Sequence, residues 1–299
     1  MRRFPGFPLF AQLFAIIAPV FVCAAIGFVW GWMGKPFETD FVTRLVTNIG
    51  TPCLIASALT GLHLTLDELG GIAIAGLAAT AGFAALGLAA LRLLKLPAHS
   101  FLPALMFPNT GNMGLPLSLF AFGETGLALA IIVFAITATL QFTLGVALAS
   151  GSFSVRRLAS MPLIYALILS LVVIATGWQV PAWIANTIGL LGGLTIPMML
   201  LALGVSLARL RVTSVPRAAV LSLVRLLGGI AVGVGVAYAL GLEGAARGVL
   251  IIQAAMPVAV YNYLFAQYFG REPEQVAGMV VLSTAASFLT LPLLLWLVL

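Results

Sequence analysis

The chain has 299 residues, of which 62% are hydrophobic and only 7% carry a charge. A soluble domain usually has about 25% charged residues, so these charges are too few to cover a soluble surface of this size. The composition excludes a soluble globular protein and predicts an all-α polytopic membrane protein. The net charge of +6 comes from bases in short loops between apolar runs. That pattern is typical of membrane topology, and we expect the lipid bilayer, not nucleic acid, as a partner.

Ten apolar windows of about 20 residues, the length that crosses a bilayer, follow one another along the chain. They cover residues 9–32, 41–61, 70–94, 99–121, 125–149, 160–178, 183–208, 216–241, 245–269 and 275–298. The first window follows Met1-Arg2-Arg3, which resembles the start of a signal peptide. It is longer than the apolar core of a cleaved signal, about 7–15 residues, so we expect a first membrane helix. The expected location is the inner cell membrane.

Basic residues in the loops predict the orientation. When the loops are assigned alternately to the two sides of the membrane, one side holds nine bases: Lys35, Arg92, Lys95, Arg156, Arg157, Arg209, Arg211, Arg217 and Arg271. The other side holds three: Arg2, Arg3 and Arg247. Because cytoplasmic loops carry an excess of Lys and Arg, we expect the central loop, 151–157, in the cytoplasm and both termini outside.

The fourth window contains a segment that does not favour a straight helix. Residues 107–116 have the sequence Phe-Pro-Asn-Thr-Gly-Asn-Met-Gly-Leu-Pro. Proline removes a backbone donor and clashes with the preceding turn. In hydrocarbon, the freed backbone groups must be satisfied by protein or by a water-filled cavity. We predict a broken helix, with Pro108, Gly111, Gly114 and Pro116 at the break. The alternative is a proline-kinked helix in ordinary packing.

The two halves of the chain have similarly spaced prolines. Pro52 and Pro197, in the second and seventh windows, are 145 positions apart, and Pro108 and Pro257, in the fourth and ninth, are 149 apart. Five spans in each half would make the second half enter the membrane inverted. Inverted repeats with broken helices at corresponding positions are typical of secondary transporters. We predict repeats over residues 1–150 and 158–299, with Met256 and Pro257 at the second break; chance spacing of the prolines is the alternative.

Two motifs resemble those of the auxin efflux carrier family. They are Pro108-Asn109-Thr110 with Met113-Gly114-Leu115-Pro116, and Gln253-Ala254-Ala255-Met256-Pro257. The family contains the plant PIN-FORMED carriers and bacterial permeases described as malonate or malate transporters; the short central loop resembles the bacterial form. The resemblance implies a ten-helix fold like that of bile acid sodium symporters, in which helices four and nine cross. Helices 1, 2, 6 and 7 would form a scaffold, which could pair two copies as a homodimer. Helices 3–5 and 8–10 would form a mobile transport domain.

The breaks predict an anion site. Aligned peptide dipoles place about half a positive charge at the first N–H groups of each half-helix, so two converging ends can bind an anion without a basic side chain. We expect a small carboxylate substrate, contacted by residues in the breaks and in span five: Asn109, Thr110, Asn112, Gln141, Pro257, Tyr261 and Asn262. The resemblance assigns substrate contact most directly to Asn109 and places Gln141 in the substrate cavity. For Asn262, a helix-packing hydrogen bond is the alternative.

Other side chains near the breaks carry simpler expectations. Met113, Leu115, Met256 and Val258 are expected to line the cavity together with Tyr261. Ser283, Ser287 and Thr290 share one face of span ten, where we expect plain packing, because such hydroxyls can bond to their own helix. Arg44 and Arg225 lie near span edges, and we expect both to extend to the cytoplasmic interface.

The sequence lacks the residues that several other functions require. No Asp or Glu lies at the centre of a predicted span, which disfavours a proton antiporter based on membrane-embedded acids. The His-Glu-x-x-His motif of zinc proteases is absent, and His63 and His99 lie in loops, so we expect no metal or other cofactor. We therefore predict a carrier that works by elevator-type alternating access. A gated anion channel or an intramembrane enzyme is the alternative.

The orientation can be tested by labelling. A cysteine introduced at Ser154, in the central loop, should resist an impermeant thiol reagent added to intact cells, because that loop is expected in the cytoplasm. Ready labelling at this position, together with no labelling of a cysteine at the C-terminus, would reverse the assignment.

Overall fold

The structure is a computed structural model that describes residues 9–61, 66–152, 159–210, 212 and 215–299. In this part of the chain every element is a helix, apart from one isolated β-bridge. The prediction of an all-α protein is therefore confirmed. Seven helical segments are long and apolar enough to cross a membrane, and two shorter apolar helices accompany them. His63, Ser154, Arg156 and Arg157 lie outside the described residues.

The first half of the chain contains three π-helical turns within otherwise α-helical segments. The order is α1 (Leu9–Trp32), α2 (Thr39–Leu45), the turn Val46–Gly50, α3 (Thr51–Thr60), α4 (Leu66–Leu93), α5 (Ala98–Met106), the turn Thr110–Gly114, α6 (Leu115–Leu140), the turn Gln141–Gly145 and α7 (Val146–Ser150). π-Helical turns inside α-helices occur frequently at functional sites.

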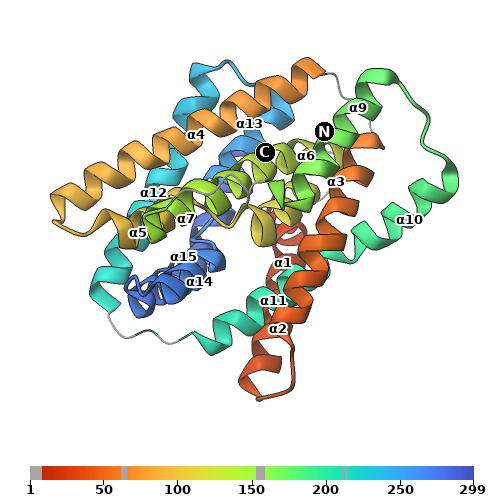
Figure 1. Cartoon of the computed structure of the whole chain (residues 1–299). Coiled ribbons are helices and arrows are strands. Elements are labelled where there is room, and N and C mark those ends of the chain that lie inside the picture. The colour runs from red at the N-terminus through yellow and green to blue at the C-terminus, as the bar shows by residue number, and fades with distance from the viewer. Residues whose placement is uncertain (1–8, 62–65, 153–158, 211, 213–214) are drawn as a thin grey trace.

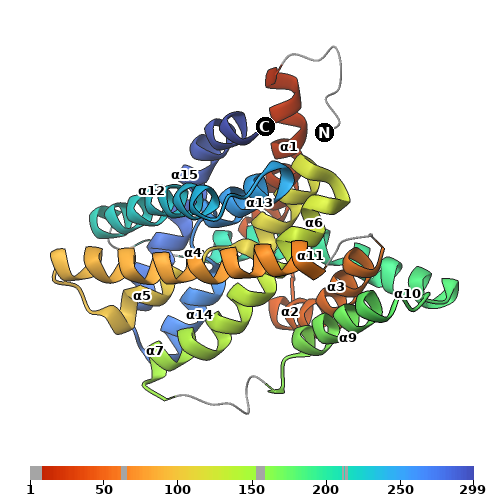
Figure 2. The same cartoon turned by 90° about the horizontal axis from the view of Figure 1, so that it is seen from above.

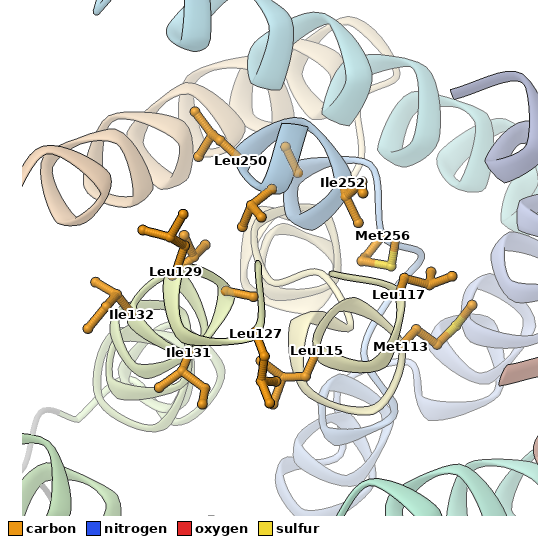
Figure 3. Packing of buried hydrophobic residues seen from close by; sticks show 14 of the residues in the cluster. Met113, Leu115, Leu117, Leu127, Leu129, Ile131, Ile132, Leu250, Ile252 and Met256 are labelled. Carbon is orange, nitrogen blue, oxygen red and sulfur yellow. The ribbon is translucent and has the colours of Figure 1, made fainter. Parts of the chain in front are cut away.

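Gly123 divides α6 into two stretches. Its φ of 66° and ψ of −158° are non-helical, and this backbone region is essentially open to glycine only. The apolar segment Thr110–Ser150 has 41 residues, twice the roughly 20 that cross a bilayer once. The kink lets the chain turn back, so that Leu117 and Leu129 lie on separate helical stretches (Figure 3).

The second half of the chain continues in the same all-helical manner. Its elements are α9 (Pro162–Thr176), α10 (Ala182–Gly193), α11 (Thr195–Arg209), α12 (Val215–Ala239), α13 (Gly244–Ala254), α14 (Val260–Phe269) and α15 (Pro273–Val298). The short, extended link between α13 and α14 lies at the second predicted break, as the link between α5 and the turn Thr110–Gly114 lies at the first.

The helices pack in two groups. In the first, α1 lies along α11, and α3 packs on α9 and α10. In the second, α12 packs on α4, α13 and α15, and α6 packs on α4 and α13. Figures 1 and 2 show α10 at one edge of the molecule and α5 and α12 toward the opposite edge. The groups meet along α6, which also contacts α1 and α3.

The main hydrophobic core includes the space between α6 and α13 and extends to α1, α3, α4, α11 and α15. Met113, Leu115 and Met256 lie there with side chains of both stretches of α6 (Figure 3). Val258 is buried in a second cluster beneath α5. The expectation that these four residues line a substrate cavity is wrong, because neighbouring helices cover them on every side.

Candidate functional site

The extended links at the two breaks pair with each other, and we call this pairing the crossing. Pro108 and Val258 form an antiparallel β-bridge. The Asn109 N–H donates to the Pro257 carbonyl at 2.7 Å, and the Ala259 N–H donates to the Phe107 carbonyl at 3.4 Å. Since proline and the chain break free these backbone groups from helical bonding, each link supplies the partners that the other lacks.

Side chains from three other positions brace the crossing. The Asn262 amide donates from Nδ2 to the Phe107 carbonyl at 2.9 Å, and its Oδ1 accepts from Gln141 Nε2 at 3.0 Å. On the opposite side, the Val258 N–H donates to Ser283 Oγ at 3.0 Å. Ser283 therefore does more than pack, whereas Ser287 bonds back to Thr284 of its own helix, as expected.

Asn109 begins the helical segment after the first break. Its side-chain Oδ1 accepts from the Asn112 N–H at 3.3 Å, which caps the turn Thr110–Gly114. Its Nδ2 has no hydrogen-bond partner among the described residues, although Asn109 is only 4% exposed. A buried donor without a partner costs about 1–3 kcal/mol. This amide group is therefore suited to bind an acceptor that enters from outside the protein.

A cavity of about 540 Å³ lies beside the crossing. Both half-helix starts border it, since its lining includes Thr110 after the first break and Val260 after the second. Among the described residues, no side chain caps the first N–H groups of α14, whereas Asn109 caps the helical start after the first break. Of the residues predicted to contact substrate, the cavity wall contains Asn109, Thr110, Asn112, Gln141 and Tyr261; Pro108 and Gly111 also line it.

The opposite wall comes from the other helix group. It includes Thr47, Asn48 and Thr51 of the second span, together with Met198 and Met199 of α11. Thr47 Oγ1 lies 3.5 Å from the Tyr261 hydroxyl, within hydrogen-bond distance across the cavity. Sequence reasoning missed this wall; the signal that could have found it is the similar spacing of Pro52 and Pro197 in the two halves of the chain, since both prolines lie next to it.

All three π-helical turns contribute to the cavity wall. Val46, Thr47 and Asn48 come from the first turn, and Thr110, Gly111 and Asn112 from the second; Gln141 and Phe142 come from the third. Phe142 packs edge to face on Tyr261, with ring centroids 5.0 Å apart. The wall thus combines apolar and aromatic side chains with many hydroxyl and amide groups. Apolar surface with placed polar groups is the usual composition of a small-molecule site.

The cavity opens at one end. Its lining includes four exposed residues: Asp40 near the start of α2, Asn48 in the turn after α2, Ser160 before α9 and Arg209 at the end of α11. The Arg209 guanidinium donates to Thr39 Oγ1 at 2.9 Å and to the Phe37 carbonyl at 3.1 Å. Arg209 is the one basic residue in the cavity wall among the described residues, and sequence reasoning assigned it only to a loop.

Several predicted residues lie outside the cavity wall. Pro257 contributes its carbonyl to the crossing, and Asn262 is 2% exposed with both ends of its amide bonded within the protein. Gly114 packs against the Gln253 side chain, and Pro116 and Met256 are buried. Pro257 and Asn262 thus support the crossing, whereas Gly114, Pro116 and Met256 lie in the protein interior.

Arg225 differs most from its expectation. It was expected to extend to the membrane interface, but it is 2% exposed within α12, whereas Arg44 is exposed. Its Nη1 donates to the Leu105 carbonyl at 2.7 Å, and its Nη2 donates to the Ala254 carbonyl. The prediction for Arg225 is wrong because these carbonyls, freed at the two helix breaks, offer the guanidinium acceptors inside the protein.

Comparison with known proteins places the chain among transporters. A family model described as a membrane transport protein matches residues 146–295. An uncharacterized transporter of Methanothermobacter thermautotrophicus is 33% identical over 193 residues, which is 62% of this chain and 63% of that protein. The uncharacterized transporter MJ1031 of Methanocaldococcus jannaschii is 26% identical over 205 residues, 65% of this chain and 66% of that protein. Auxin efflux carrier component 1 of Arabidopsis thaliana is 34% identical over 113 residues, which is 37% of this chain and 17% of that protein.

The multi-pass helical fold and these matches define the class as a membrane transport protein. The chain spans less than two thirds of the length of each of the three relatives. Within the class, the chain belongs to the auxin efflux carrier family. The resemblance of the motifs around Pro108 and Pro257 is thereby confirmed.

The bracing role of Asn262 predicts a stability effect that does not depend on substrate. Asn262→Ala leaves Gln141 Nε2 without its acceptor and removes one donor from the Phe107 carbonyl, so it should destabilise the protein by about 1–3 kcal/mol. The measurement is the melting temperature of the purified protein in detergent. Gln267→Ala, on the exposed face of the same helix, is the control and should melt like the wild type. Equal melting temperatures for Asn262→Ala and wild type would exclude the bracing role.

Proposed function

We propose that the protein is a secondary carrier of a small organic carboxylate, of the size of malonate, malate or an auxin-like acid. The observation that supports this most directly is the unpartnered Asn109 amide on a cavity bordered by two half-helix starts. Helix N-termini favour anions because their first N–H groups are free and the peptide dipoles align. A volume of about 540 Å³ falls in the range of ligand sites, about 300–1,000 Å³.

The proposed mechanism is elevator-type alternating access. The cavity lies between the two packing groups of helices: Asn109, Gln141 and Tyr261 come from one, and Thr47, Asn48 and Met199 come from the other. In this proposal the second packing group, which contains α4, α6, α12, α13 and α15, is the mobile domain and carries the substrate. It corresponds to helices 3–5 and 8–10 of the two predicted inverted five-helix repeats. The first packing group, which contains α1 and α11, corresponds to helices 1, 2, 6 and 7 and remains fixed in the membrane. The polar contact between Thr47 and Tyr261 across the cavity is long at 3.5 Å, which suits surfaces that slide apart.

The cavity mouth suggests which state the structure represents. Arg209 and Ser160 lie at the mouth, and they border loops on the side where nine of the loop bases are found. If that side is cytoplasmic, as the basic residues predict, the structure corresponds to an inward-facing state. Arg209 would then attract an anion to the mouth from the cytoplasm.

The charge of the substrate tests the proposal. One carboxylate and its uncharged amide analogue should differ in affinity at the same pH, with the carboxylate bound more tightly, because the half-helix ends favour negative charge. Binding is measured by thermal shift of purified protein, since a ligand stabilises by mass action. Counter-flow-stimulated, saturable uptake of the same carboxylate into liposomes would support a carrier, and single-channel currents would support a channel. Equal affinity for the two analogues would contradict the anion-carrier proposal.

Asn109 should be required for transport but not for folding. Asn109→Ala removes a hydrogen bond to a charged group, which contributes about 1.5–3 kcal/mol, so carboxylate affinity should fall about ten- to a hundredfold. Gln141→Ala should show a smaller loss. The control is Asn186→Ala, an exposed asparagine on α10 away from the cavity, which should transport like the wild type. Unfolding of Asn109→Ala in mild detergent would mean that Asn109 acts as a helix-break brace instead.

A further inference from the structure

The crossing has a second side, where the first halves of the two broken helices end. α5 ends at Met106 and α13 ends at Ala254. The last four carbonyls of a helix have no partner within it, and the aligned dipoles give each such end about half a negative charge. Two ends that converge in the interior of the protein therefore create a site that attracts a cation.

The guanidinium of Arg225 occupies this site. It bonds to the Leu105 carbonyl in the last turn of α5 and to the Ala254 carbonyl at the end of α13. The Phe83 ring lies 4.2 Å from the guanidinium carbon, in cation–π range. Gly229 leaves the necessary space, because a Cβ at this position would touch both the Ala254 carbonyl and Arg225 Nη2. Three separate helices thus shape the pocket around one charge.

Burying the Arg225 cation costs free energy that its contacts must offset. Taking an ion out of water costs several kcal/mol, and the loss is offset only by good geometry and by hydrogen bonds to the remaining donors. The acceptors of Arg225 within the described residues are backbone carbonyls. In ion-coupled transporters with broken helices, unwound carbonyls and half-helix C-terminal ends coordinate the coupling cation. Arg225 donates to the same kind of groups.

We propose that Arg225 is a built-in cation at the crossing, which takes the place of a sodium or other metal ion bound by these carbonyls. The protein then needs no dissolved metal cation to stabilise the crossing. If the protein also carries carboxylates as proposed above, that transport is independent of sodium. The first statement concerns folding alone and does not rest on the proposed substrate.

The test measures how the melting temperatures of the purified wild type and variants in detergent change with the cation in solution. Choline, sodium, potassium and lithium chlorides are used at equal ionic strength. Wild type should melt at one temperature in all four salts. Arg225→Ala should melt lower by about 5–10 °C, and part of the loss should be recovered by a small cation, either sodium or guanidinium at low millimolar concentration. Arg225→Met, which fills the space without a charge, should be destabilised without any recovery, whereas Arg225→Lys should lie nearest to wild type.

The control is Arg247→Ala, an exposed arginine near Tyr238, which should neither lower the melting temperature nor introduce a cation response. Two results would overturn the proposal: sodium-specific stabilisation of the wild type, or an Arg225→Met variant as stable as the wild type. The wild-type melting temperatures in the four salts still test the proposal if the Ala and Met variants cannot be purified. Carboxylate uptake into liposomes should be unchanged when choline replaces sodium. If no carboxylate binds while the melting results hold, the proposed function fails and the role of Arg225 stands.

Discussion

The structure depends on the hydrogen bonds that join the two broken helices. A backbone N–H or carbonyl left without a partner in an apolar interior costs several kcal/mol, so neither break would be stable alone. The bond from the Asn109 N–H to the Pro257 carbonyl at 2.7 Å, and its counterpart from Ala259 to Phe107, satisfy both links at once. Asn262 and Ser283 complete the set from neighbouring helices. Each break is therefore stable only because the other break supplies its hydrogen-bond partners.

This pairing separates charge within the membrane-embedded part of the protein. The C-terminal carbonyls of α5 and α13 both accept hydrogen bonds from Arg225. The N-terminal residues of the helical segments after each break border the cavity. One side of the crossing thus holds a buried guanidinium, and the other side borders the cavity. The Asn109 amide, with one end used to cap the turn and the other unpartnered, belongs to the open side.

The two packing groups explain why the site can be both precise and accessible. Asn109 and Gln141 are held by bonds within their own group, so their positions do not depend on the opposite wall. Across the cavity, the groups are also joined by the contact between Thr47 and Tyr261. The site thus lies where two packing groups meet, while its polar side chains are held within one of them.

The sequence by itself determined the class of the protein and the places where its helices break. The scarcity of charge requires a membrane environment, and proline acts on its own backbone, so Pro108 and Pro257 mark the breaks without knowledge of the fold. Asn109 was identifiable for the same local reason. Hydropathy could not distinguish a helix face covered by lipid from one covered by protein, because both environments are apolar. For that reason Met113 and Leu115 were expected in the cavity but lie in the core.

Only the tertiary structure decided which partners meet at the crossing. Asn262 donates to the carbonyl of Phe107, 155 positions earlier, and Arg225 donates to the carbonyl of Leu105, 120 positions earlier. Such pairings depend on how helices distant in the chain pack, and no local pattern contains them. Arg225 lay in an apolar run near a basic loop, which favours a side chain that extends to the interface. The free carbonyls of two converging helix ends, which exist only in the folded protein, bind it inside instead.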